Sequence, residues 1–143
     1  METQIIAAPD CLDASLDPKY LYSQLMFAAG GDRGVADLLG VTRQGRLALI
    51  ELKASEDIQL PLQALDYWLR VSRHHADGDF QRLGYFRGIT LDPRPPLLWL
   101  VAPGFQFHSS TGVLLGFASH ETEIFQIGLN ENWRQNLMVT FRR

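Results

Sequence analysis

The sequence predicts one α/β domain over residues 1–143, built as a mixed β-sheet flanked by helices. Three observations lead to this prediction. Three consecutive stretches have the composition of strands, a stretch with a wide apolar helical face follows them, and a short, wholly apolar strand comes next. A helix between two strands forms the crossover that parallel strands need. The chain is also long enough to bury a core, with 46% hydrophobic and 20% charged residues.

The first half of the chain contains the three consecutive strands. Residues 20–29 are apolar and aromatic, and they predict a strand that ends at Gly30-Gly31-Asp32. Residues 35–42 and 46–53 predict two more strands, joined by a short turn. Both are largely apolar on each face, as expected of central strands rather than edge strands.

The second half alternates helices with strands. Residues 60–75 carry apolar side chains at helical spacing, and Pro61 suits the first turn of a helix because its missing N–H is not needed there. Residues 97–102 are wholly apolar, as in a buried strand. The remaining predicted elements are a helix within residues 109–118 and a C-terminal hairpin of strands at residues 123–128 and 137–142.

The bulk composition excludes several functional classes. The formal net charge is −3, so the chain lacks the overall basic excess of proteins that coat nucleic acid nonspecifically; nucleic-acid binding would need positive charge gathered on one face, or metal ions. Cys11 is the only cysteine, which excludes an internal disulfide and a cysteine-based metal site. No apolar run approaches the roughly 20 residues that span a bilayer, and the N-terminus leads into no signal-peptide core. We therefore expect a cytoplasmic protein with no membrane partner.

The turn at Arg43-Gln44-Gly45 predicts how the two central strands pair. A three-residue hairpin loop typically closes with a residue in the left-handed region, which glycine tolerates. With this loop, Asp37 lies directly opposite Glu51, and opposed side chains point to the same side of the sheet. Alternation along the strand puts Lys53 on that side too. A two-residue loop would instead shift the pairing by one position and move Asp37 to the other face.

Two opposed carboxylates on apolar strands predict a cation site. Without a partner, Asp37 and Glu51 would repel each other and lose hydration on burial. Mg²⁺ prefers hard oxygen ligands and takes one or two carboxylates together with water and substrate phosphate. The backbone carbonyl of Leu52 would add an oxygen, and Lys53 would stabilise developing charge on the phosphate or orient an attacking water. These groups are the parts of metal-assisted phosphodiester hydrolysis.

The same residues carry a resemblance to a known family. Asp37, followed after thirteen residues by Glu51-Leu52-Lys53, resembles the motif of the PD-(D/E)XK nuclease superfamily. Gln63 and Tyr67 lie one helical turn apart, similar to the Gln-x-x-x-Tyr element of the RecB-like branch. The resemblance covers residues 22–71 and implies a restriction-endonuclease-like fold, a need for Mg²⁺ or Mn²⁺, and a nucleic-acid substrate, with DNA favoured over RNA. It further implies a catalytic set, and a metal held by Asp37, Glu51 and the Leu52 carbonyl. That catalytic set is Asp37, Glu51, Lys53, Gln63 and Tyr67.

The N-terminal segment departs from this family. The family fold usually opens with a helix, which often carries a glutamate that joins the site. Residues 1–19 instead have prolines and aspartates spaced as in loops, so they predict a weakly structured lead-in whose sole glutamate is Glu2. We expect either that the usual opening helix and its acidic group are missing, or that Asp10, Asp13 or Asp17 supplies that group.

A second function stays open on the sequence alone: a catalytically inactive module with a nuclease fold, used for protein assembly or DNA docking. The acidic net charge and the missing opening helix favour this alternative. A homodimer formed through an exposed strand or an apolar helix would complete what a short chain lacks. Against the alternative, a module without catalysis has no reason to hold Asp37 and Glu51 together.

Overall fold

The structure is a computed structural model that describes residues 1–29 and 32–143. A six-stranded sheet runs through the molecule in the order β1-β2-β3-β4-β5-β6. Its central pairs, β3 with β4 and β4 with β5, are parallel, and the other pairs are antiparallel. The predicted mixed sheet with a C-terminal hairpin is therefore confirmed. The strands are β1 (Leu16–Ala29), β2 (Asp32–Thr42), β3 (Leu47–Leu52), β4 (Leu97–Pro103), β5 (Ile124–Leu129) and β6 (Val139–Arg142).

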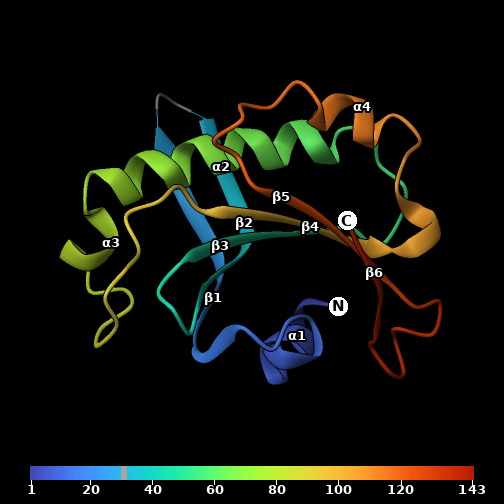
Figure 1. Ribbon diagram of the computed structural model, residues 1–143, viewed down its shortest axis with the longest axis horizontal. Coiled ribbons are helices and arrows are strands. Elements are labelled where there is room, and N and C mark those ends of the chain that lie inside the picture. The colour runs from blue at the N-terminus through green and yellow to red at the C-terminus, as the bar shows by residue number, and fades with distance from the viewer. Residues whose placement is uncertain (30–31) are drawn as a thin grey trace.

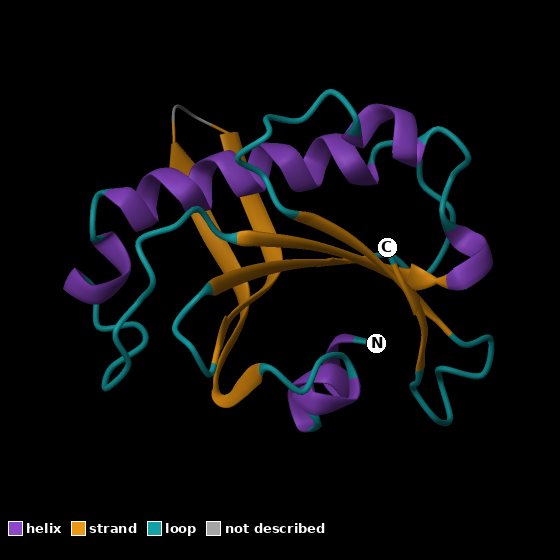
Figure 2. Cartoon of the chain, in the orientation of Figure 1, coloured by secondary structure: helices purple, strands orange, loops and turns teal. Residues whose placement is uncertain are grey.

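Helices cover both faces of the sheet (Figures 1 and 2). The long helix α2 (Leu60–Ala76) connects β3 to β4 and lies along one face, and α1 (Glu2–Ala7) lies on the opposite face. No helix among the described residues is long and apolar enough to cross a membrane. The shorter helical elements are η1 (Pro9–Cys11), α3 (Asp79–Arg82), η2 (Gly104–Gln106) and α4 (Thr111–Leu115).

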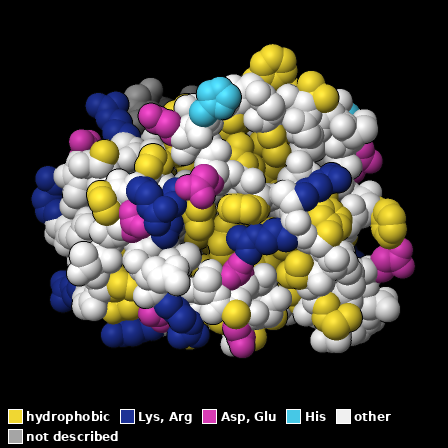
Figure 3. All heavy atoms as spheres, viewed as in Figure 1, with side chains coloured by type: hydrophobic (Ala, Val, Ile, Leu, Met, Phe, Trp, Pro, Cys, Tyr) yellow, Lys and Arg dark blue, Asp and Glu magenta, His cyan; other side chains and the backbone are white. Residues whose placement is uncertain are grey.

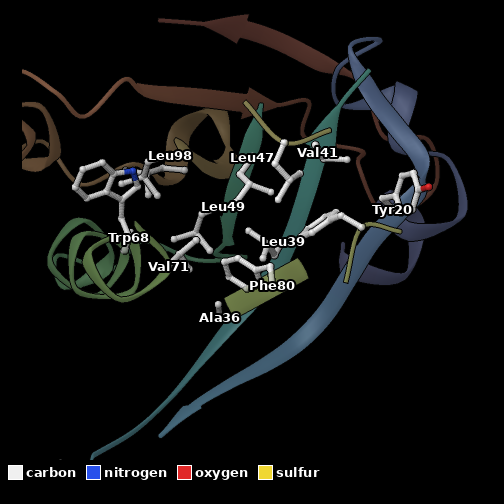
Figure 4. Packing of buried hydrophobic residues seen from close by; sticks show 14 of the residues in the cluster. Tyr20, Ala36, Leu39, Val41, Leu47, Leu49, Trp68, Val71, Phe80 and Leu98 are labelled. Carbon is white, nitrogen blue, oxygen red and sulfur yellow. The ribbon is translucent and has the colours of Figure 1, made fainter. Parts of the chain in front are cut away.

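One hydrophobic cluster fills the space between the sheet and α2 (Figure 4). Because side chains alternate along a strand, Leu47 and Leu49 of β3 both point to this face. The apolar stripe of α2 meets them through Ala64, Trp68 and Val71, which are all buried. Burying each large side chain stabilises the fold by roughly 1.5–3 kcal/mol. This packing holds α2 against the strands that carry the candidate site.

A second cluster covers the opposite face and fastens both ends of the chain to it. Ile50 of β3 and Trp99 of β4 lie here, and Ile5 of α1 packs with them, fully buried. Arg142 of β6 stacks over the Trp99 ring, with 4.6 Å from the guanidinium carbon to the ring centroid, and forms an ion pair with Asp13. Asp13 precedes β1 and Arg142 ends β6, so this ion pair joins the segment before one edge strand to the other edge strand.

The N-terminal segment differs from the prediction. The predicted weakly structured lead-in contains α1 and η1, and β1 begins at Leu16 rather than at residue 20. A helix as short as α1 is marginal by itself, so its own sequence pattern is weak; burial of Ile5 against the sheet stabilises it. The predicted strand end at Gly30-Gly31 lies outside the described residues.

The predicted turn between β2 and β3 is confirmed. Gly45 has φ +92°, and its N–H donates to the carbonyl of Thr42 at 2.8 Å, while the Thr42 N–H donates to the carbonyl of Arg46 at 2.8 Å. A Cβ at Gly45 would collide with the carbonyl oxygen of Thr90, because the segment that leads into β4 docks on this turn. Glycine is therefore required here for two reasons, the left-handed backbone and the close contact.

We expect Gly45→Ala to lower the free energy of unfolding by about 2–4 kcal/mol, because strain and the clash with Thr90 add together. Gly78→Ala is the matched control for the backbone alone, since Gly78 has φ +72° and open space around an added Cβ; it should cost about 1–2 kcal/mol. Gly112→Ala in α4, also in open space, should be neutral or stabilising. Urea unfolding of the three variants measures the differences. Equal losses in the free energy of unfolding for Gly45→Ala and Gly78→Ala would show that the clash with Thr90 adds nothing to the cost of the substitution.

Candidate active site

The candidate site lies where β2 and β3 separate. Their backbone ladder runs from Val41–Leu47 to Leu38–Ile50, the register predicted from the turn, and ends one position before Asp37 and Glu51. Beyond it, β2 continues with β1 as a two-stranded ribbon that extends past the rest of the sheet (Figure 1). Meanwhile β3 continues alongside β4. The backbone pairing between β2 and β3 therefore stops just before Asp37 and Glu51.

Side chains replace the missing backbone pairs at this point. The N–H of Leu52 donates to Oδ2 of Asp37 at 2.8 Å, and the N–H of Asp37 donates to Oε1 of Glu51 at 3.3 Å. Each carboxylate thus binds a backbone group of the neighbouring strand. The structure therefore brings the two predicted carboxylates close together, each bonded to a backbone N–H of the other strand.

Both carboxyl groups are held in surroundings that disfavour their charge. Glu51 is 5% exposed, and burial, together with the nearby Asp37 carboxylate, raises its pKa from 4.5 to about 8. Burial also raises the pKa of Asp37, while the hydrogen bond from Leu52 opposes the rise. At neutral pH the Glu51 carboxyl group therefore carries a proton for much of the time, and a cation placed beside it would displace that proton.

Lys53 lies beside the two carboxylates, at the end of β3. Its charge lowers the pKa of both Asp37 and Glu51, although burial outweighs this effect. Its ammonium forms an ion pair with Asp57, with 2.9 Å between Nζ and Oδ2, and Asp57 in turn accepts a hydrogen bond from the N–H of Gln59 at 2.8 Å. Asp57 therefore holds the Lys53 ammonium near the start of α2. Asp57 belongs to no motif in the sequence, so its role beside Lys53 is visible only in the structure.

A third carboxylate approaches the site from α1. The charge of Glu2 contributes to the raised pKa of Asp37. Glu2 accepts hydrogen bonds of 3.2 and 3.3 Å from the side-chain amide of Gln24, which stands opposite Asp37 in the β1–β2 register and has φ 54°. A helix before the first strand, expected to be missing, is therefore present as α1, and it carries Glu2. The signal was the sole glutamate before the first strand, three residues ahead of buried Ile5.

The aspartates proposed as substitutes are used elsewhere. Asp13 pairs with Arg142 and accepts a hydrogen bond from the N–H of Ser15 at 2.7 Å. Asp17 accepts a hydrogen bond from the N–H of Lys19 at 3.0 Å. Asp10 lies in η1 and affects only the pKa of the neighbouring Cys11 thiol among the shifts resolved in the described residues.

Gln63 and Tyr67 lie one turn apart on α2 but reach different surroundings. The Tyr67 ring packs on β2 at Gly34, where an added Cβ would lie 2.6 Å from Cε1 of the ring. Tyr67 is therefore held three residues from Asp37 along β2. Gln63 is exposed, and within the described chain its side chain makes no hydrogen bond with Asp37, Glu51 or Lys53.

The donor set suits a hard divalent cation. Two carboxylates converge, and the Leu52 carbonyl is the predicted third oxygen; Mg²⁺ commonly binds through one or two carboxylates and fills its remaining positions with water. Among the described residues, no three or more His, Cys, Asp and Glu side chains are grouped as a ready-made metal site. The raised pKa of Glu51 is the observation that favours a cation, because an added positive charge removes the repulsion from Asp37.

Comparisons with known proteins support the fold. No family model matches the chain, and no curated protein matches its sequence. A repair endonuclease from Pyrococcus abyssi superposes with a TM-score of 0.53 and 19% identity, over 85% of this chain and 42% of that one. A complex of EndoMS with double-stranded DNA superposes with a TM-score of 0.53 and 16% identity, over 88% of this chain and 42% of that one.

The likeness confirms the predicted nuclease-like fold. At identities under one fifth it carries information on the fold alone. The chain spans less than half the length of these two solved structures.

The pKa of Glu51 leads to a pH-dependent stability. The folded protein keeps a proton on Glu51 up to about pH 8, whereas the unfolded chain releases it near 4.5, so stability should fall as pH rises from 5 to 8. One pKa unit corresponds to about 1.4 kcal/mol, so the loss is on the order of a few kcal/mol. Glu51→Gln cannot ionise and should lose much less stability over the same range. Urea unfolding at pH 5, 6.5 and 8 measures the free energy of unfolding of both proteins. An equal loss of stability with pH in the two proteins would contradict the burial of an uncharged Glu51.

Proposed function

We propose that the chain is a nuclease that uses Mg²⁺ or Mn²⁺ to hydrolyse phosphodiester bonds in DNA. The observation that carries the proposal is the pair of Asp37 and buried Glu51 at the point where β2 and β3 separate, with Lys53 beside them. Two neighbouring carboxylates with raised pKa values, one of them buried, destabilise a fold, so their presence beside an ammonium supports a functional role. DNA is the proposed substrate class because one fold neighbour is a repair endonuclease and another is in complex with double-stranded DNA.

The cation would be held by the carboxylates of Asp37 and Glu51 and by the backbone carbonyl of Leu52. When bound, such a cation supplies Lewis-acid polarisation of the phosphate and acidifies water. The hydrogen bond from the Leu52 N–H keeps the Asp37 carboxylate oriented toward β3. Glu2, held by Gln24, adds negative charge on the α1 side and strengthens attraction for a cation.

Lys53 would contact the phosphate of the substrate. Its ammonium has three N–H donors, and the ion pair with Asp57 leaves others to donate to a phosphate oxygen and stabilise the charge that develops there. Tyr67, packed on Gly34, would bound the site on the α2 side. Gln63, exposed one turn earlier, would offer its amide to the substrate.

The distribution of charge fits binding that depends on a metal ion. On the face drawn in Figure 3, Lys and Arg side chains are interspersed with Asp and Glu, and hydrophobic side chains reach the surface between them. With a net charge of −3, nonspecific attraction to phosphates is weak. A divalent cation at Asp37 and Glu51 would supply positive charge at the place where the scissile phosphate must lie.

A catalytically inactive module for protein assembly or DNA docking is the second candidate function. One observation favours it: among the described residues, no three or more potential metal-ligating side chains form a group, so the cation would depend on only two carboxylates, a carbonyl and water. Under this alternative, Asp37 and Glu51 would bind no metal. The two experiments below separate the candidates.

Cleavage requires Asp37 and Glu51 if the proposal is right. We expect Asp37→Asn and Glu51→Gln each to lower the Mn²⁺-dependent rate at least about 100-fold, and EDTA to abolish it. Asp66→Asn is the control, because Asp66 is an exposed carboxylate on α2 paired with Arg70, and its rate should match that of the unchanged protein. The assay uses single-stranded, duplex and branched DNA and RNA. Cleavage that survives both substitutions, or that persists in EDTA, would overturn the assigned site.

Metal binding should release protons, independently of cleavage. Because the pKa of Glu51 is about 8, its carboxyl group is mostly protonated at pH 7, and Mn²⁺ binding should displace about one proton per ion. Isothermal titration calorimetry in buffers of different ionisation enthalpy measures this number. Glu51→Gln should bind Mn²⁺ more weakly and release no proton. Absence of Mn²⁺ binding in the unchanged protein would favour the inactive module.

A further inference from the structure

Two adjoining hollows, together called the groove, lie next to the candidate site where the parallel strands end. The first is a hollow of about 280 Å³ that begins at Ala54, directly after Lys53, and is bordered by Phe105 and Arg134. It adjoins a larger hollow of about 500 Å³ between η2 and the loop from β5 to β6, and Phe105 and Glu131 line both. In Figure 1, η2 and this loop lie at the same end of the sheet, on the right of the view.

Phe105 stands at the junction of the two hollows with most of its ring in solvent. Its exposure is 83%, among the highest of the large hydrophobic side chains in the described residues. An aromatic ring exposed inside a concave surface is a site for contact with another apolar or aromatic group. Nucleobases stack on such rings irrespective of sequence, because every base has a π-face.

The position of Phe105 is fixed relative to Lys53. The N–H of Glu56 donates to Oε1 of Gln106 at 3.0 Å, which ties η2 to the segment after Lys53. On the other side, an added Cβ at Gly104 would lie 3.3 Å from the Phe141 ring, so η2 is packed closely on the C-terminal hairpin. The ring is therefore a platform on a packed backbone at a set distance from the candidate site.

The opposite wall of the groove is joined to α1. The side-chain amide of Gln4 donates to the carbonyl oxygens of Trp133 and Arg134, at 2.8 and 3.1 Å. The Arg134 guanidinium lies over the Trp133 ring, 4.4 Å from its centroid. The helix that brings Glu2 to Asp37 thus also positions this wall, and both walls are connected to elements of the candidate site.

The charges in the groove favour a base over a backbone phosphate next to Phe105. Glu131 lines both hollows, and a carboxylate there repels phosphate but accepts hydrogen bonds from exocyclic amino groups. Arg134, which lines the hollow nearer to Lys53, is placed to attract the phosphate that precedes the base. The hollow nearer to Lys53 is thus lined by the Arg134 guanidinium together with Glu131 and Phe105, whereas only Glu131 and Phe105 also line the larger hollow.

We infer that this groove is a subsite for an unpaired nucleobase of a DNA strand, with Phe105 as its stacking platform. The inference rests on the proposed nuclease function and narrows its substrate to DNA with a single-stranded segment beside the cleaved bond. A base held within a duplex is already stacked on both faces, so it gains nothing from Phe105. A strand with a free base gains a stacking partner at a fixed place relative to Lys53.

The test measures binding rather than cleavage. Fluorescence anisotropy follows a labelled single-stranded oligodeoxynucleotide, and a strand of equal length with abasic sites, first without divalent ions and then with Ca²⁺. We expect Phe105→Ala to weaken binding of the base-bearing strand about 5- to 100-fold and to leave the abasic strand unchanged. Phe105→Trp should retain affinity, whereas Phe105→Leu, apolar but not aromatic, should not.

Phe117→Ala is the matched control. Phe117 follows α4, is 83% exposed like Phe105, and lines neither hollow, so its removal should leave both affinities unchanged. Equal effects of Phe105→Ala and Phe117→Ala, an equal loss on the abasic strand, or full affinity in Phe105→Leu would each overturn the subsite; the last would indicate an apolar contact surface for protein. If the unchanged protein binds DNA and Phe105→Ala has no effect, only the subsite fails. If it binds no strand, the proposed function fails with it.

Discussion

The register between β2 and β3 sets where Asp37 lies relative to Glu51 and Lys53, the central groups of the candidate site. The turn closed by Gly45 fixes that register, and the last backbone pair, Leu38 with Ile50, lies one step before Asp37 and Glu51. A shift by one residue would send Asp37 to the other face, because side chains alternate along a strand. The segment ahead of β4 docks on the same turn at Thr90, so packing and local geometry enforce one pairing.

Separation of the two strands is what makes the site possible. In a continuous ladder the register would set Leu52 opposite Ala36 and pair their backbone groups, so the Asp37 carboxylate would lose the N–H of Leu52 as a partner. Here the Asp37 carboxylate accepts the N–H of Leu52, and the Glu51 carboxylate accepts the N–H of Asp37. The cost is a buried carboxyl group with a raised pKa, which a bound cation would relieve. The same feature thus underlies the fold, the pH dependence and the proposed chemistry.

The elements around the site are joined to one another rather than only to the core. The helix α1 carries Glu2 toward Asp37 and Gln4 toward the groove wall. The segment after β3 carries Lys53 and also contacts η2, where Phe105 is exposed. The proposed action on a strand with an unpaired base would need the phosphate site and the base site at a constant separation. These links would supply that constraint without a large basic surface.

Local signals in the sequence determined the main architecture and the central pair of the site. A glycine in a three-residue turn, alternation along β3 and the apolar face of α2 each act between near neighbours in the chain, so the mixed sheet and the β2–β3 register that leads up to Asp37 and Glu51 were predictable. Only the tertiary structure decided which distant groups join them. The helix α1 forms because Ile5 is buried, Glu2 lies near Asp37 and is held by Gln24, and the groove lies between η2 and the loop before β6. Such contacts depend on packing between remote segments, which leaves no periodic pattern in the sequence.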